Sequence, residues 1–225
     1  MATDTESGPS STEQLGPDGR PKRVYKDTPF DLAFIQVCRQ AYGKLAQWQS
    51  PRSYEDGYRG MVDVSLALMR SRPNVKEQRA AILQGFPKVP QWFRKAFPYS
   101  NWGAELNARI TPAFFTWLVG PMEIFEVEID GVKQRSGVQI ERCRYLEESG
   151  CTGMCVNLCK FPTQTFFTEE LGMPLSMEPK FEDLSCQMIF GKKPPDIEDD
   201  EVMKQPCFAL CPTANVQAPA CPKLR

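Results

Sequence analysis

The sequence contains no histidine among its 225 residues. Histidine provides the general base of Ser-His-Asp hydrolases, two ligands of the two-His-one-carboxylate iron site, and ligands of zinc proteases. Its absence excludes all three classes. Any metal that this chain binds must be held by Cys, Asp, Glu, Met, Tyr or backbone oxygen.

Long apolar runs and a strong excess of one charge are also missing. The longest apolar run, FFTWLVGPM at residues 114–122, is much shorter than the roughly 20 residues of a membrane-spanning helix. The 27 basic and 28 acidic residues give a net charge of −1, which argues against a nucleic-acid binder. Residues 1–27 lack the apolar core of a secretory signal, and their acidic residues are not typical of a transit peptide.

Helical periodicity dominates the first half of the chain. Thr28 followed by Pro29 is typical of a helix start, and apolar residues then recur at helical spacing until residues 43–47. Cys38 lies on this apolar stripe, and we expect it to be a small buried hydrophobe. Further helical segments are predicted at residues 54–70, 75–86, 92–97 and 103–118.

The last of these helices is expected to be interrupted near Pro112. Its end is rich in aromatic residues, namely Phe114, Phe115 and Trp117. These side chains are expected either to enter a helical core or, together with Leu118, to form one wall of an apolar ligand cavity.

The pattern changes after residue 121. Residues 123–129 alternate as EIFEVEI, Asp130-Gly131 is a hairpin dipeptide, and residues 132–141 form the returning strand. Helices, a β-hairpin and then a Cys-rich part with short helices make the predicted fold class α+β. We predict three regions: a disordered lead-in at 1–27, a single domain at 28–211 whose Cys-rich segment is 143–211, and a tail at 212–225.

Cysteine is concentrated in the second half, where eight of the nine cysteines follow residue 142. Cys151, Cys155 and Cys159 are four residues apart, so they would share one face of a continuous helix. The first and last would then lie about 12 Å apart along the axis. One metal ion with metal–sulfur bonds of about 2.3 Å cannot bridge that distance.

The segment is therefore predicted to be broken. Glycines at 150 and 153 favour a loop at Cys151, with Thr152 capping a short helix that Pro162 ends. A fourth thiol must come from elsewhere, and the candidates are Cys143, Cys186, Cys207 and Cys211. Four thiolates suit zinc or an iron–sulfur cluster, whereas disulfides and unligated or redox-active thiols are the alternatives. The acidic run at 196–201 is expected to be a solvated loop.

Several stretches of this sequence resemble a known family. The run CRYLEESGCTGMCVNLCKFP at 143–162, its continuation to residue 195, KQPCF at 204–208, WLVGP at 117–121 and YKD at 25–27 are similar to the plant and algal carotenoid isomerase family named after the rice "dwarf twenty-seven" mutant. The resemblance covers most of residues 24–211. It is dense from 143 to 207 and weak from about 52 to 106.

This resemblance implies an iron-dependent cis/trans isomerase that interconverts all-trans and 9-cis β-carotene, or another cis isomer, in plastids, at the start of strigolactone biosynthesis. It implies non-haem iron as the cofactor, with the choice between a mononuclear site and an iron–sulfur cluster left open. An apolar carotenoid would reach the protein through peripheral membrane contact. The cysteines that match family positions are Cys143, Cys151, Cys155, Cys159, Cys186 and Cys207.

Two other functions remain compatible with the residues. A non-catalytic, metal-stabilised module that binds carotenoid or assists assembly would use the same cysteines structurally. A thiol-redox protein would instead use Cys151, Cys155 or Cys159 without metal.

Overall fold

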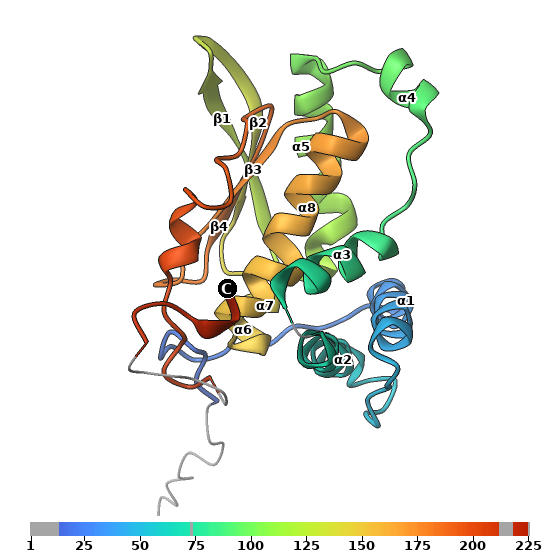
Figure 1. Ribbon diagram of the computed structural model, residues 1–225, viewed down its shortest axis with the longest axis vertical. Coiled ribbons are helices and arrows are strands. Elements are labelled where there is room, and N and C mark those ends of the chain that lie inside the picture. The colour runs from blue at the N-terminus through green and yellow to red at the C-terminus, as the bar shows by residue number, and fades with distance from the viewer. Residues whose placement is uncertain (1–13, 73, 212–217, 225) are drawn as a thin grey trace, which may run out of the picture.

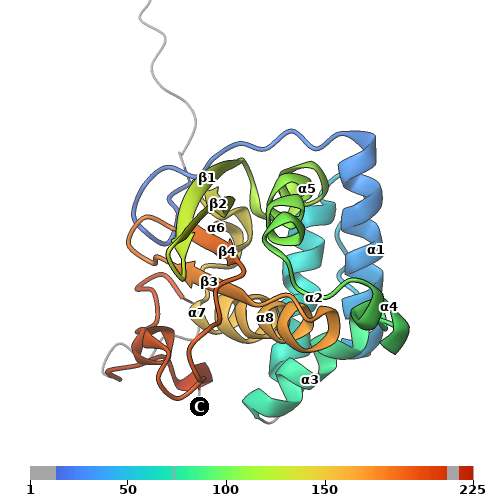
Figure 2. The same ribbon diagram turned by 90° about the horizontal axis from the view of Figure 1, so that it is seen from above.

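The computed structural model of the chain describes residues 14–72, 74–211 and 218–224, and it confirms the α+β class. A four-stranded antiparallel sheet with the order β1-β2-β4-β3 stands beside the helices (Figure 1). Viewed from above, α5 and α8 pack next to the sheet, and α1 and α2 lie beyond them (Figure 2). In the described part of the chain, no helix combines the length and the apolar character needed to cross a bilayer. The helices of the first half are α1 (Pro29–Ala46), α2 (Gly57–Ser71), α3 (Val75–Gly85), α4 (Gln91–Ala96) and α5 (Asn101–Val119).

The start of α1 is confirmed. Thr28 is the N-cap, its hydroxyl oxygen accepts a hydrogen bond from the Asp31 amide, and Asp31 completes a capping box. The predicted apolar stripe is only partly buried, because Cys38 and Tyr42 pack against the core while Phe34 and Val37 are exposed. The buried face also includes Arg39, whose guanidinium donates to three backbone carbonyls in the α1–α2 connection. These hydrogen bonds satisfy the buried charge and fix how α1 packs on α2.

The prediction of a break at Pro112 was wrong, since α5 runs without interruption from Asn101 to Val119. The proline removes one backbone hydrogen bond, but the helix packs along β2 and buries Ala104, Ala108 and Thr111. The Thr111 hydroxyl also donates to the Asn107 carbonyl. Tertiary packing therefore outweighs the local cost of Pro112.

The β-hairpin is confirmed, with β1 (Met122–Ile129) paired to β2 (Val132–Ile140). Asp130 and Gly131 both have positive φ, 52° and 79°, as a type I′ turn requires. Two further strands were not predicted. These are β3 (Leu175–Pro179) and β4 (Cys186–Phe190), and β4 pairs with both β2 and β3.

The predicted break at Cys151 is confirmed, because Cys151 has an extended backbone between two helices, but the helix that follows is a longer rod than predicted. It consists of α7 (Thr152–Met154), a π-helical stretch η1 (Cys155–Lys160), α8 (Phe161–Thr165) and a second π-helical stretch η2 (Phe166–Leu171). It follows α6 (Arg144–Ser149) after the short link at Gly150 and Cys151.

Pro162 does not end this helix. Phe161 keeps helical dihedrals, φ −65° and ψ −44°, and its amide donates to the Val156 carbonyl five residues earlier. This wider π-type pairing accommodates the proline ring, which in a regular helix would clash with the carbonyl four residues before it. Thr152 does not cap the helix either, because Cys151 precedes the first turn and the Thr152 hydroxyl donates to the Pro206 carbonyl at 2.9 Å.

The lead-in differs from the predicted disorder wherever it is described. Residues 1–13 lie outside the described residues, but residues 14–27 lie against α6. The Arg142 guanidinium forms a two-pronged ion pair with Asp18, and Arg144 forms one with Asp27. Arg144 also stacks over the Tyr58 ring at 3.7 Å from its centroid. These contacts hold α6 in place between the N-terminal segment and α2.

The described part of the tail also packs on the domain. The Asn157 side-chain amide donates to the Lys223 carbonyl at 2.5 Å, and Leu224 is buried. The tail contains the short 3-10 helix η4 (Pro222–Leu224), and another, η3 (Glu201–Lys204), precedes the tail.

The type I′ turn at Asp130 and Gly131 can be tested by substituting Gly131. No atom lies within 4 Å of the position that a Cβ at Gly131 would occupy, so Gly131→Ala adds backbone strain and no clash. We expect it to lower the free energy of unfolding by about 1 kcal/mol, measured by urea denaturation. Gly131→Asn is the control, because Asn tolerates positive φ better, and equal losses for both variants would contradict a type I′ turn.

Candidate active site

An apolar cavity of about 150 Å³ is lined by residues of both the helices and the sheet. Its walls come from α1, α2, α5, the helical rod at residues 152–171 and strands of the sheet. Most of the lining is hydrocarbon. Of the two alternatives for the aromatic end of α5, the cavity wall holds for Phe115 and Leu118, whereas Trp117 is buried against Phe34. Phe114 points elsewhere and is exposed. A cavity of this character suits an apolar ligand.

Five thiols from four places in the fold line this cavity. Cys143 directly precedes α6, Cys155 and Cys159 lie on η1, Cys186 begins β4, and Cys38 comes from α1. Pairing in the sheet places Cys186 beside Ile140, and the Cys143 amide donates to the Leu184 carbonyl at 2.7 Å. The β2–β4 pairing therefore brings Cys143 and Cys186 to one wall of the cavity.

Four of the six predicted site cysteines thus share this cavity. Cys38, expected to be a small buried hydrophobe, is partly buried and also lines it. The sequence could not predict that Cys38 lines a cavity. An apolar residue of a helix has the same periodic pattern whether it faces a cavity or a filled core.

Burial keeps the cavity thiols protonated. It raises the pKa of Cys143 to about 11 and that of Cys159 to about 12, and it raises the pKa values of Cys155 and Cys186 well above the ordinary value. Neighbouring thiols raise the pKa values of Cys155, Cys159 and Cys186 further, because two thiolates side by side repel. Thiol exchange requires a thiolate, so this site is poorly suited to disulfide chemistry.

Lys160 is the one cationic side chain among the described residues that line the cavity. Its ammonium lies 2.7 Å from a carboxylate oxygen of Asp200 and donates to the Met177 carbonyl at 2.5 Å and to Gln164 at 3.2 Å. Both charged groups are almost fully buried. The expectation of a solvated acidic loop is therefore wrong for Asp200, because a carboxylate stays buried only when a cation and hydrogen bonds compensate it.

The other two predicted cysteines, Cys151 and Cys207, belong to a second thiol group with Cys211 and Cys221. Cys207 hydrogen-bonds with Cys221, and Cys151 interacts electrostatically with Cys207 and Cys211. The backbone brings them together, since the Cys221 amide donates to the Gln205 carbonyl at 2.7 Å. Burial raises the pKa of Cys151 to about 11 and that of Cys221 to about 12.

The donor set of the cavity consists of thiols, which as thiolates are ligands of both zinc and iron–sulfur clusters. Its spacing is not that of a formed site: in the described ranges, no three Cys, Asp or Glu side chains are close enough together to hold a metal ion. Metal binding would therefore have to remove thiol protons and draw the sulfur atoms together. A bound cation would also reverse the mutual repulsion that now raises the thiol pKa values.

Comparison with known proteins bears on this site. The family model "Beta-carotene isomerase D27-like, C-terminal" matches residues 117–199. Two relatives are named "Beta-carotene isomerase D27, chloroplastic". The one from Medicago truncatula is 38% identical over 207 residues, which is 90% of this chain and 81% of the relative. The chain belongs to the β-carotene isomerase D27-like family.

The second relative, from Arabidopsis thaliana, is 44% identical over 167 residues, or 72% of this chain. The chain thus spans 63% of the length of that relative. No solved structure matches the chain.

The matched family region contains most of the cavity thiols. Residues 117–199 include Cys143, Cys155, Cys159 and Cys186, together with Lys160. Cys38 and three of the four members of the second thiol group lie outside it. The family-specific part of the chain therefore coincides with the wall of the cavity that carries the thiols and the buried cation.

The buried ion pair generates a stability prediction. Lys160→Met leaves the Asp200 carboxylate buried without its cation, so we expect the free energy of unfolding to fall by about 3–5 kcal/mol, measured by urea denaturation. The matched control is the double variant Lys160→Met/Asp200→Asn, which removes both charges and should recover part of the loss. A loss below about 1 kcal/mol in the single variant, as for an exposed pair, would contradict this role.

Proposed function

We propose that this protein is a carotenoid cis/trans isomerase of plastids that acts on β-carotene or a close relative, interconverting all-trans and 9-cis or another cis isomer, in apocarotenoid and strigolactone biosynthesis. Membership of the D27-like family is the observation that supports it most strongly, together with relatives named as chloroplastic β-carotene isomerases. The apolar cavity beside the family-specific thiols provides a place for a hydrocarbon ligand.

We further propose that the isomerase uses non-haem iron held by Cys143, Cys155, Cys159 and Cys186. These thiols line one cavity, whereas Cys151 and Cys207 lie with the second group. When bound, iron would supply the electron exchange that transiently lowers the order of a carbon–carbon double bond. A hydrocarbon polyene has no acidic or basic group on which a proton-transferring side chain could act instead.

The residues of the chain provide the surroundings for this chemistry. Phe115, Leu118 and Met188 line the cavity, where they would contact the polyene and exclude water. The buried Lys160 ammonium contributes a positive charge beside the thiols and lowers the pKa values of Cys155 and Cys186 against the effect of burial. It therefore favours the thiolate forms that a metal requires.

The size of the cavity limits how the substrate binds. A volume of about 150 Å³ is below the roughly 300–1,000 Å³ of pockets that enclose a drug-sized ligand. A long polyene would therefore place only the reacting segment inside, and the remainder would extend past the rim. Since water solvates such a chain poorly, peripheral membrane contact is part of the proposal.

Isomerase activity is tested with the full chain, purified without oxygen and incubated with all-trans β-carotene in detergent micelles. We expect the ratio of cis to all-trans isomers to approach the same value from either starting isomer, as measured by chromatography. Intact, folded protein that leaves every isomer ratio unchanged would support the non-catalytic binding module instead.

The iron ligands are tested separately by metal analysis. Cys155→Ser and Cys186→Ser are each expected to lower the iron content per chain and the visible absorption of the anaerobic protein, with circular dichroism used to verify folding. Cys221→Ser, a buried thiol of the second group, is the matched control and should keep its iron. Unchanged iron in the two cavity variants, or a colourless protein with stoichiometric zinc, would reject this site.

A further inference from the structure

An exposed apolar stripe follows the outer side of α5. Trp102, Leu106, Ile110 and Phe114, here called the α5 stripe, are spaced by four residues and are 70%, 40%, 42% and 52% exposed. At 3.6 residues per turn, this spacing keeps them on one side of the helix. The side that packs on the sheet carries Ala104 and Ala108, which are fully buried. A helix that packs on a core by one face usually has polar residues on its opposite face. The large apolar residues of the α5 stripe therefore are not explained by packing within the domain.

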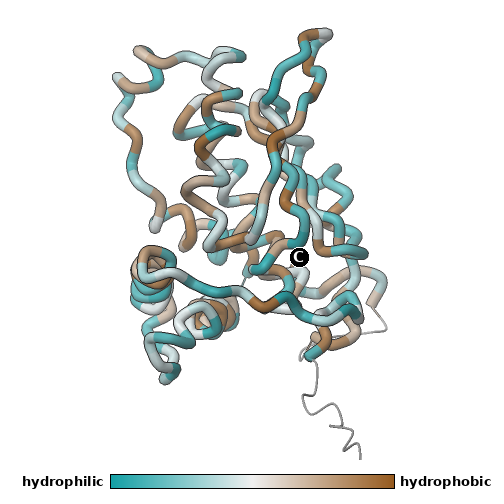
Figure 3. The backbone as a smooth tube through the Cα atoms, turned by 180° about the vertical axis from the view of Figure 1, so that it is seen from behind, coloured by the Kyte–Doolittle hydropathy of each residue, from teal (hydrophilic) through white to brown (hydrophobic). Residues whose placement is uncertain are grey.

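Further exposed aromatic residues lie on α4 and in the connection between α4 and α5. Trp92 and Phe97 are 63% and 58% exposed. The Phe93 and Phe97 rings lie 4.9 Å apart, which fixes the orientation of this short helix. In Figure 1, α4 and the start of α5 form the upper right corner of the molecule, and Figure 3 shows hydrophobic stretches interspersed along the same region.

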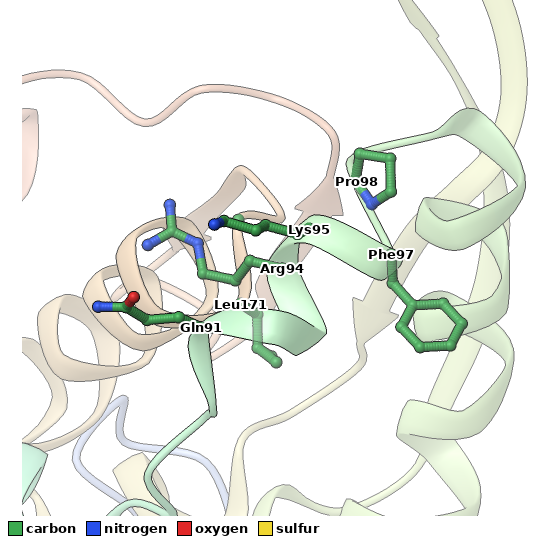
Figure 4. A pocket seen from close by; sticks show the side chains of 7 residues that line it. Gln91, Arg94, Lys95, Phe97, Pro98 and Leu171 are labelled. Atoms are coloured by element: carbon green, nitrogen blue, oxygen red, sulfur yellow. The ribbon is translucent and has the colours of Figure 1, made fainter.

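Positive charge accompanies these aromatic residues. Residues 88–115 contain four basic residues and one acid, Glu105, although the whole chain has a net charge of −1. Glu105 accepts a hydrogen bond from the Arg135 amide. In Figure 4, Arg94 and Lys95 extend from α4 toward the same open space, away from the Phe97 ring, and they border a surface hollow with Leu171.

The same helix reaches the cavity. Phe115 follows the last residue of the α5 stripe, lines the cavity and is 43% exposed, so it belongs to both the cavity wall and the outer surface. Aromatic side chains with basic residues are typical of proteins that lie in the interface of a bilayer.

We propose that the α5 stripe, together with Arg94 and Lys95 of α4, docks on an anionic lipid bilayer. This docking would bring the cavity wall at Phe115 to the hydrocarbon layer of the bilayer. The significance of this docking for substrate rests on the proposed function, because a carotenoid dissolved in the bilayer would then enter the cavity without crossing water. The part of the polyene that does not fit in the cavity would stay in the lipid.

The positive charge of this surface favours an anionic bilayer over a second copy of the chain. A symmetric dimer through the α5 stripe would place two surfaces of the same net positive charge against each other, whereas an anionic bilayer attracts both. Residues 1–13 contain acidic groups that would complement this charge. Their apolar residues are limited to Met1, Ala2 and Pro9, which are too few to cover the stripe.

Vesicle flotation tests the proposal with the full chain. We expect binding to phosphatidylcholine vesicles that contain phosphatidylglycerol, weaker binding to phosphatidylcholine alone, and weaker binding at high salt. Arg94→Glu/Lys95→Glu should lower the partition coefficient by about tenfold or more, and Trp102→Ser/Phe114→Ser should lower it on both lipids. Trp48→Ser/Lys204→Glu removes an exposed tryptophan and an exposed lysine outside this surface and should bind as the wild type does.

The stripe variant is also assayed for isomerisation in detergent micelles, because neither Trp102 nor Phe114 lines the cavity. Wild-type-like turnover in micelles with slower turnover of vesicle-embedded β-carotene supports the proposal. Wild-type protein that fails to float with anionic vesicles, a stripe variant that binds as well as the wild type, or a dimer that dissociates when the stripe is changed would overturn it. Vesicle binding without isomerisation in any medium would leave docking intact and reject the proposed function.

Discussion

The buried ion pair between Lys160 and Asp200 connects three parts of the chain at one point. Lys160 lies on the helical rod, its ammonium also donates to a carbonyl of β3, and Asp200 belongs to the acidic run before η3. An unpaired charge at either buried position would destabilise the fold, because water cannot solvate it there. The rod, the sheet edge and the C-terminal segment are therefore held in one relative position, and the cavity is the space that this arrangement leaves against α1 and α5.

The helical rod contains Pro162, which a regular α-helix would not accommodate in its interior. The π-helical stretches let the chain pass Pro162 without ending, and they occur where Cys155, Cys159 and Lys160 face the cavity. π-Type turns are frequent at functional sites because they shift side chains relative to a regular helix. The irregular backbone and the chemically significant residues thus coincide, and the same stretch lies inside the family-specific region.

The separation of the thiols into two groups gives a division of roles. The cavity group lies beside an apolar space and a buried cation, whereas Cys151, Cys207, Cys211 and Cys221 join the start of the rod to the C-terminal segment. Phe115 of α5 lines the cavity and is also exposed at the surface. The proposed chemistry on a hydrocarbon, the proposed access from lipid and the attachment of the tail therefore involve different surfaces of the same small domain.

Local patterns in the sequence were sufficient for the features that depend on neighbouring residues. The α1 start, the hairpin turn at Asp130-Gly131 and the α+β class were predicted correctly because caps and turns are decided within a few residues. The absence of histidine and the concentration of cysteine pointed to thiols as the main candidate ligands. Helix spacing also indicated that Cys151 and Cys159 could not share one metal from an unbroken helix.

Only the tertiary structure decided what long-range packing controls. It carried α5 through Pro112 and the rod through Pro162, because packing against the sheet exceeds the local cost of a proline. It paired β4 with β2, which set Cys186 beside Ile140, and it placed Asp200 against a lysine forty positions earlier in the chain. Which thiols meet is a question of distance in space, and spacing along the chain does not determine that distance once strands and helices have packed.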